Sequence, residues 1–229
     1  MNVYKVPSVD FENVAVEFLV NSLKKLQGQK DKIAIALSGG STPIPILKRL
    51  VEENLEWEKF HFFLVDERCV SLNDAQSNYG TIKQLFFDHI ASHSYSMIKE
   101  GLSVDESIQA YEADMIREIT YGNDGHPIFD LMLLGMGEDG HTASLFPGTL
   151  ALEEKTKTVV KNFVPKLNMD RITLTYPTII NAKELVVMIK GDKKKQIFDQ
   201  LHTQEGTDFP IQKIVDEYSD LKWIIETEQ

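Results

Sequence analysis

Three short, almost wholly apolar runs constrain the fold of this chain more than any other feature of its sequence. They cover residues 33–37, 61–65 and 129–134, and each passes directly into a polar or glycine-rich segment. Their apolar residues follow one another without the alternation that is typical of a strand with one face in solvent. Parallel strands that are covered on both faces by helices have this composition. The sequence therefore predicts an α/β fold with a doubly wound, mostly parallel sheet and helices on both faces.

The apolar periodicity places further elements on both sides of these runs. We expect an opening strand at residues 3–6, a helix that Ser8 caps, and a helix from Pro43 to about Glu53 with Thr42 as its N-cap. The second half predicts strands at 158–163, 171–174 and 185–189, a helix at 192–201, and a strand at 223–226 that closes the edge of the sheet. No internal repeat or proline-rich linker marks a boundary, so residues 1–229 are expected to form a single domain.

The composition excludes one class of partner. The 229 residues are 42% hydrophobic, which is enough for one sizeable core, but the formal net charge is -11. Nucleic-acid binding requires a basic face that neutralises many phosphates, so no nucleic-acid partner is expected. An anionic small molecule would instead need a local cluster of lysine and arginine.

The cysteine content and the apolar stretches indicate a cellular compartment. The single cysteine, Cys69, cannot form an internal disulfide. The first residues lack the basic start and long apolar run of a secretory signal, and the longest apolar stretches are far too short to cross a bilayer. We therefore expect a cytoplasmic protein with no membrane partner. A small apolar residue would serve equally well at Cys69, so we do not expect it to be a nucleophile.

The segment after the first apolar run is a candidate anion site, because ligands of open α/β sheets bind outside the carboxyl ends of the strands. It contains Gly39, Gly40, Ser41 and Thr42 ahead of the helix that starts at Pro43. Glycines let the backbone approach a phosphate, and the N–H groups of a helix N-terminus attract an anion. A plain tight turn with a capping threonine has the same sequence, so this segment alone leaves both interpretations open.

The segment after the third run carries the acid–base chemistry. It places three glycines around Glu138, Asp139 and His141. Histidine titrates near neutral pH, and a neighbouring carboxylate can orient its ring and stabilise its protonated form. We therefore expect His141 to act as a general base, with Glu138, Asp139 or Asp66 as the carboxylate that orients it. An exposed histidine in a mobile loop is the alternative interpretation.

Metal binding is another chemistry that an Asp-x-His sequence can support. This chain has no His-Glu-x-x-His helix and no cysteine pair, and Asp139 with His141 supplies only two potential ligands. We therefore expect neither a metal nor another cofactor.

Together, these segments resemble the 6-phosphogluconolactonase family of the pentose phosphate pathway over nearly the whole chain. The most specific match runs without a gap over residues 135–148, Gly-Met-Gly-Glu-Asp-Gly-His-Thr-Ala-Ser-Leu-Phe-Pro-Gly. Supporting matches are residues 37–43, residues 66–70 followed by Ser77 and Asn78, residues 171–175, Lys166, and Gly191 with Lys194. The family often has prolines after the matched lysine, where this chain has Leu167 and Asn168.

The resemblance implies a Rossmann-like fold shared with sugar-phosphate isomerases and deaminases, and hydrolysis of 6-phosphoglucono-δ-lactone. It implies His141 as the base that activates water, oriented by Asp139 or another carboxylate. Arg68 or a backbone N–H of the glycine-rich loops would donate to the oxyanion, unless Arg68 holds a sugar hydroxyl or pairs with Asp66. The residues expected to bind the substrate and its phosphate are Gly39, Gly40, Ser41, Thr42, Asp66, Lys166, Arg171 and Lys194. Asp66 has an alternative role, in which it only fixes its own loop.

Two other functions are weighed against this one. A glucosamine-6-phosphate deaminase has a similar glycine loop and histidine, but it typically reads Asp-Glu-Tyr where residues 66–68 read Asp-Glu-Arg, and it differs after the histidine. A non-catalytic sugar-phosphate sensor would keep the phosphate loop without needing His141 beside Asp139. The lactonase is therefore favoured, as a monomer or small homo-oligomer whose partner is a sugar-phosphate lactone.

Overall fold

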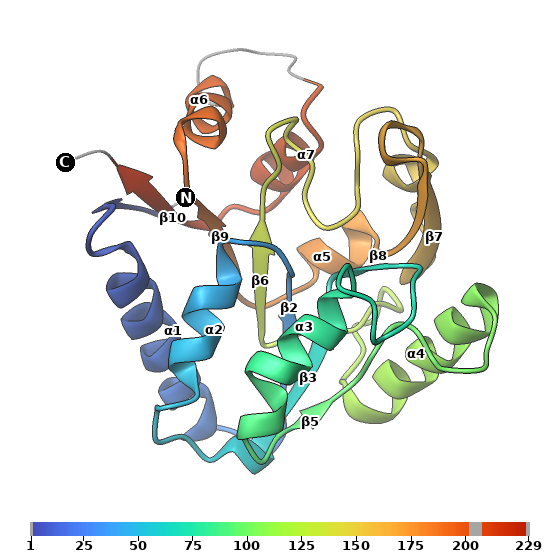
Figure 1. The fold of residues 1–229 in the computed structure, drawn as a ribbon, viewed down its shortest axis with the longest axis horizontal. Helices are drawn as coiled ribbons and strands as arrows, with labels where there is room; N and C mark the ends of the chain where they lie inside the picture. The colour runs from blue at the N-terminus through green and yellow to red at the C-terminus, as the bar shows by residue number, and fades with distance from the viewer. Residues whose placement is uncertain (1, 202–207, 228–229) are drawn as a thin grey trace.

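The computed structural model describes residues 2–201 and 208–227, and its centre is a parallel sheet (Figure 1). Across the described residues the sheet has seven strands in the order β1, β10, β9, β6, β2, β3 and β5. Their bounds are Asn2–Pro7 (β1), Lys222–Thr227 (β10), Leu185–Ile189 (β9), Leu131–Gly135 (β6), Ile33–Leu37 (β2), Phe60–Leu64 (β3) and His93–Ser94 (β5). Every neighbouring pair is parallel, which confirms the predicted architecture.

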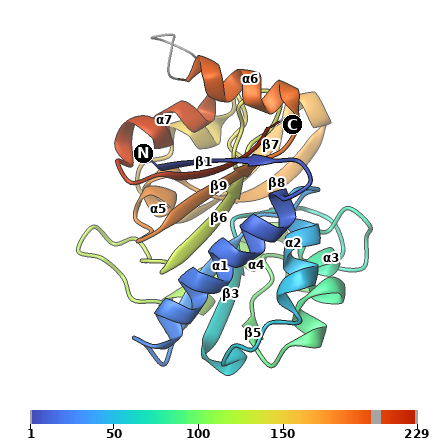
Figure 2. The ribbon, with the colours of Figure 1, turned by 90° about the vertical axis from the view of Figure 1, so that its left-hand side faces the viewer.

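Helices cover this sheet on both sides (Figure 2). Their bounds are Phe11–Gln27 (α1), Pro43–Leu50 (α2), Asn78–Leu85 (α3), Val104–Glu118 (α4), Tyr176–Ile180 (α5), Asp192–Gln200 (α6) and Pro210–Glu217 (α7). On one side α1 packs on α2 and α2 on α3, and on the other α5 packs on α7. Among the described residues, none of the helices has the length and apolar composition that a membrane span requires.

The apolar runs of the sequence are the central strands of the sheet. Every residue of β2, β3 and β9 is buried, and so are the first four residues of β6. A strand that is covered on both faces has no solvent side for polar residues, which is why these runs do not alternate.

A second, smaller sheet lies beside the first, and the sequence did not indicate it. Its strands β4 (Asp66–Arg68), β8 (Met169–Leu174) and β7 (Val159–Val164) are antiparallel. The Asp-Glu-Arg segment, expected as a loop after β3, is therefore a short strand. Its pairing with β8 places Arg68 directly opposite Arg171.

The edge of the main sheet differs from the prediction. β10 does not close the sheet, because β1 pairs outside it along its whole length. The burial of the two strands agrees with these positions, since only Val6 of β1 is buried, whereas Trp223, Ile224 and Ile225 of β10 are all buried.

The helix termini also differ in part from those that the sequence predicted. α1 begins after Asp10, so the predicted cap at Ser8 is wrong. Thr42 precedes α2 but forms no capping hydrogen bond with its side chain, so that part of the prediction is wrong too. α2 ends at Leu50 and not near Glu53.

Candidate active site

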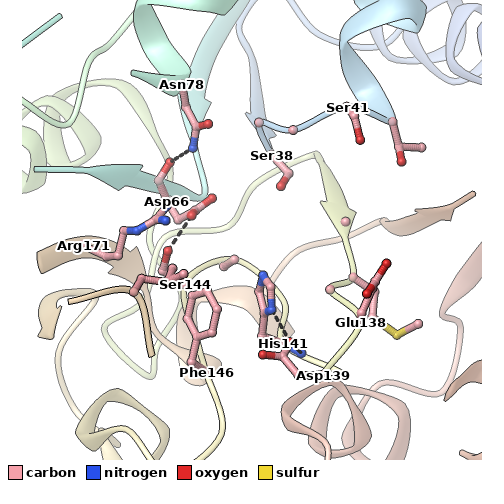
Figure 3. A pocket seen from close by; sticks show the side chains of 18 of the residues that line it. Ser38, Ser41, Asp66, Asn78, Glu138, Asp139, His141, Ser144, Phe146 and Arg171 are labelled. Atoms are coloured by element: carbon pink, nitrogen blue, oxygen red, sulfur yellow. Dashed lines mark hydrogen bonds and ion pairs between the residues drawn. The ribbon is translucent and has the colours of Figure 1, made fainter. Parts of the chain in front are cut away.

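The segments that follow β6, β2 and β3 lie together at the carboxyl ends of these strands, because the three strands are neighbours and run parallel. A cavity of about 340 Å³ lies between them (Figure 3). The residues that the sequence singled out for catalysis or binding all line it: Gly39, Gly40, Ser41, Thr42, Asp66, Arg68, Asp139, His141, Lys166, Arg171 and Lys194. The fold thus brings the predicted residues together, while their roles stay predictions.

Asp139 is the carboxylate that contacts the His141 ring. Its Oδ1 lies 2.5 Å from Nδ1 of His141, and the other ring nitrogen points into the cavity, away from Asp139 (Figure 3). The other two candidate carboxylates are engaged elsewhere. Glu138 pairs with a lysine of α6 at 2.9 Å, and Asp66 accepts from Oγ of Ser144 at 2.6 Å. Of the three carboxylates that the sequence left open, Asp139 is therefore the one placed to orient the base.

Lys166 extends this pair into a short chain of charges. Its Nζ lies 2.9 Å from Oδ2 of Asp139. Burial alone would raise the pKa of Asp139, but the hydrogen bonds with His141 and Lys166 outweigh burial and hold that pKa below its usual range. Asp139 is therefore ionised at neutral pH, where it can stabilise a positive charge on the imidazole. The Lys166 side chain is 67% exposed, so solvent screens its contribution.

Two further contacts fix the plane of the His141 ring. Phe146 stacks on the imidazole with the ring centroids 3.9 Å apart and the planes at 20°. On the backbone side, a Cβ at Gly137 would lie 2.1 Å from the His141 ring and 2.9 Å from Asp139, so only glycine leaves room for the pair. Neither contact was predicted. A turn with Ala143 at φ 48° brings Phe146 back to the histidine, and residue spacing alone does not reveal such a turn.

The glycine loop between β2 and α2 packs against the start of α3. A Cβ at Gly39 would lie 2.0 Å from Oδ1 of Asn78, whose Nδ2 donates to the carbonyl of Asp66. Gly40 has a φ of +99°, which other residues rarely adopt. Both glycines are therefore required for steric reasons, and the loop ends at the positively polarised N-terminus of α2. Asn78, to which the sequence gave no role, also lines the cavity.

Three buried or half-buried cations, Arg68, Arg171 and Lys194, line the cavity. Arg68 and Arg171 are cross-strand neighbours, and within the described part of the chain the Nε of each is buried without a hydrogen-bond partner. Burial lowers the pKa of Arg171, and the nearby Arg68 lowers it further; burial also lowers the pKa of Lys194. Arg68 donates to the carbonyl of Gln76 rather than forming the alternative pair with Asp66. Such a group of cations suits an anionic ligand.

Two other kinds of chemistry, metal binding and nucleophilic attack by Cys69, can be compared with the structure. Within residues 2–201 and 208–227, no group of three or more His, Cys, Asp or Glu side chains is arranged to hold a metal ion. Burial raises the pKa of the Cys69 thiol to about 11, which keeps it protonated and unreactive at neutral pH. Among the residues that line the cavity, His141 and Asp139 lie in contact as a potential acid–base pair, and this role stays a prediction.

Comparisons with known proteins find similar sequences and folds over nearly the whole chain. The profile of the family described as glucosamine-6-phosphate isomerases/6-phosphogluconolactonase matches residues 8–223. The 6-phosphogluconolactonase of Chlamydia pneumoniae is 32% identical, over 98% of this chain and 86% of that protein. The crystal structure of the 6-phosphogluconolactonase of Thermotoga maritima has a TM-score of 0.86 and 27% identity, and the match covers 99% of each chain. A monomeric glucosamine-6-phosphate deaminase shares the fold, with a TM-score of 0.78, 22% identity, and coverage of 100% of this chain and 98% of its own.

Proposed function

The chain belongs to the glucosamine-6-phosphate isomerase/6-phosphogluconolactonase family, and we propose that it hydrolyses 6-phosphoglucono-δ-lactone to 6-phosphogluconate in the oxidative pentose phosphate pathway. The observation that carries this proposal is the 2.5 Å contact between Asp139 and His141 in a cavity lined by Arg68, Arg171 and Lys194. The pair supplies a general base, and the cations suit a phosphate. Relatives above 30% identity are named 6-phosphogluconolactonase, which supports the lactone as the substrate. The deaminase is 22% identical, so its similarity to this chain is evidence for the fold alone.

The 6-phosphate binds at the glycine loop and at the cations. Its oxygens accept from the backbone of the loop, from hydroxyl groups and from two basic side chains: Gly39, Gly40, Ser41, Thr42, Arg171 and Lys194. Asp66 and Lys166 contact the sugar. Anchoring the phosphate holds the lactone carbonyl against His141, so that the reacting groups are already oriented when water attacks.

The chemistry proceeds in two proton transfers. His141 takes a proton from water as the water oxygen bonds to C1, and Arg68 or a backbone N–H donates to the oxyanion that forms. The bond between C1 and the ring oxygen then breaks, and the imidazolium returns its proton to that oxygen. Asp139 orients the ring and stabilises its charge between the two transfers.

The reaction as written requires no metal and no other cofactor. The acidic composition and the single Cys69 favour a cytoplasmic enzyme, which we propose acts as a monomer or small homo-oligomer on its small-molecule substrate.

The test is the rate of hydrolysis of freshly generated 6-phosphogluconolactone above its spontaneous rate, with a chelator present. Wild type and His89→Ala, which changes an exposed histidine outside the cavity, should accelerate hydrolysis strongly, whereas His141→Ala should not. Ammonia release from glucosamine 6-phosphate would support a deaminase instead. Binding of 6-phosphogluconate without any turnover of the lactone would support a sensor.

A further inference from the structure

We propose that Phe146 is a positioning residue whose aromatic face stabilises the imidazolium that His141 becomes during the reaction. The inference rests on the proposed function, because His141 must carry the proton of the attacking water for a charge to form. The face of an aromatic ring is electron-rich and attracts a cation. Phe146 therefore favours the charged form of the base over the neutral form, and so favours the transition state over the ground state.

The stacking geometry supports a charged partner. The centroids of the two rings are 3.9 Å apart and their planes differ by 20°, so the imidazole lies nearly face to face with the benzene ring. A cation is attracted to the face of an aromatic ring within about 6 Å of its centroid, and the imidazole lies well inside that distance. Phe146 is only 6% exposed, so water does little to weaken the attraction.

The loop between the two rings holds them together. Leu145 N donates to the carbonyl of Thr142 at 3.0 Å, and Ala143 between them has a φ of 48°. A residue other than glycine keeps this conformation only where its surroundings require it. The Phe146 carbonyl in turn accepts from Oγ1 of Thr149 at 2.8 Å. These hydrogen bonds hold the backbone on both sides of Phe146, and so the point from which its ring reaches His141.

The charges around His141 explain why an uncharged group is useful there. Asp139 favours the imidazolium through its contact with Nδ1. The cations that line the cavity oppose it: Arg68, Lys166, Arg171 and Lys194. The remaining carboxylates are Asp66, which accepts from Ser144, and Glu138, which pairs with a lysine of α6. A further carboxylate at the ring would repel an anionic substrate, whereas an aromatic face stabilises the imidazolium without adding a negative charge.

A series of fluorinated phenylalanines at position 146 tests the inference. Fluorine withdraws electron density from the ring face and changes the shape of the side chain little. From 4-fluoro- through trifluoro- to pentafluorophenylalanine we expect kcat to fall progressively, by about two- to thirty-fold in all, with KM unchanged. The acidic limb of the kcat/KM profile should move to lower pH along the series. If the Phe146 ring only fills space, kcat and the acidic limb of the kcat/KM profile should stay constant along the series.

The same series at Phe87 is the matched control, because that side chain is 8% exposed, packs on other aromatic rings and lies outside the cavity. It should change neither kcat nor the pH profile. Phe146→Leu, followed by thermal unfolding to verify its folding, should lose as much kcat as the pentafluoro variant. A constant kcat in the Phe146 series, or an equal decline in the Phe87 series, would overturn the inference.

An NMR titration of the His141 ring in the unliganded protein separates this inference from the proposed function, because it requires no lactonase activity. The pH midpoint of the ring signal should fall along the Phe146 series and stay constant along the Phe87 series. A midpoint that falls in a protein without lactonase activity would overturn the function and support the stacking effect. A constant midpoint in an active lactonase would overturn the stacking effect alone.

Discussion

Oδ1 of Asp139 accepts a hydrogen bond from Nδ1 of His141 at 2.5 Å, within a single loop of the chain. An ionised carboxylate can only accept, so Nδ1 carries the ring proton and Nε2 is the basic nitrogen. Nε2 is also the nitrogen that points into the cavity (Figure 3). One hydrogen bond therefore fixes both the orientation of the proposed base and its tautomer.

Asp139→Asn should lower kcat by about 10²- to 10⁴-fold, because an amide can donate to Nδ1 and so favour the wrong tautomer, and because it leaves the imidazolium without a counter-charge. KM should change little. Glu138→Gln is the matched variant: its carboxylate is 59% exposed and pairs with Lys193, so it should retain activity within about tenfold. Steady-state kinetics of both variants test this prediction. A larger loss of kcat in Glu138→Gln than in Asp139→Asn would mean that Glu138, and not Asp139, orients the base.

Gly137→Ala should lower kcat as strongly as loss of the Asp139 contact does, although it adds only one methyl group. The new Cβ would lie 2.1 Å from the His141 ring, so the ring must leave its position between Asp139 and Phe146. Gly28→Ala, which meets nothing closer than 3.6 Å, is the control for adding a methyl group. Kinetics and the thermal unfolding midpoint should be measured together, and full activity in Gly137→Ala would show that the ring has another productive position.

The sequence predicted which residues come together at the cavity, because these residues lie directly after three buried strands. The runs at β2, β3 and β6 are recognisable by their apolar composition, and parallel neighbouring strands place the loops at their carboxyl ends along one edge of the sheet. His141, Asp139 and Gly39 were found in this way. α4 was not assigned, although the capping box of Ser103 and Glu106 at its start was readable.

Other parts of the site depend on contacts between distant segments. Arg68 lies opposite Arg171 because β4 pairs with β8, about a hundred residues away along the chain, and the sequence does not state that pairing. Asn78 reaches Gly39 through the packing of α3 on α2. Phe146 reaches His141 through a turn that includes a left-handed alanine, a conformation that sequence preferences argue against.

Lys194→Gln should raise KM by about tenfold or more, because a charge-assisted hydrogen bond to the phosphate is lost, while kcat changes less. Burial lowers the pKa of Lys194, which is the direction expected for a partly desolvated ammonium, and an anionic ligand would favour its charged form. Lys195→Gln, on the same helix but outside the cavity, is the control. Inhibition by 6-phosphogluconate should weaken in parallel, and an unchanged inhibition constant would place the phosphate elsewhere.

Stability should fall between about pH 6.5 and pH 4 because of His61. Burial, and then the neighbouring His93 at 4.5 Å between ring centroids, lower the pKa of His61 to about 4. The unfolded chain binds a proton near pH 6.5 and the folded chain only near pH 4, so acid favours unfolding across this window, by at most about 3 kcal/mol. The contribution of His61 is fully present above that window and lost at its lower end.

His61→Gln should flatten this dependence. The free energy of unfolding in urea, measured at several pH values from 7 to 4, should decline less steeply for His61→Gln than for the wild type. His89→Gln changes an exposed histidine and should keep the wild-type slope. Equal slopes for wild type and His61→Gln would mean that other groups cause the acid sensitivity.

Lys166→Met should have a small effect, and mainly on the binding of the substrate. Its ion pair with Asp139 spans 2.9 Å, but the lysine side chain is 67% exposed, and exposed pairs contribute at most about 1 kcal/mol. We therefore expect kcat to fall less than about fivefold, because the hydrogen bond with His141 still holds Asp139 in place. KM should rise several-fold, because the proposed contact with the sugar is lost. Added salt should shrink the difference from wild type, since it screens an exposed charge. A tenfold loss in kcat at constant KM would instead mean that Lys166 acts on the base through Asp139.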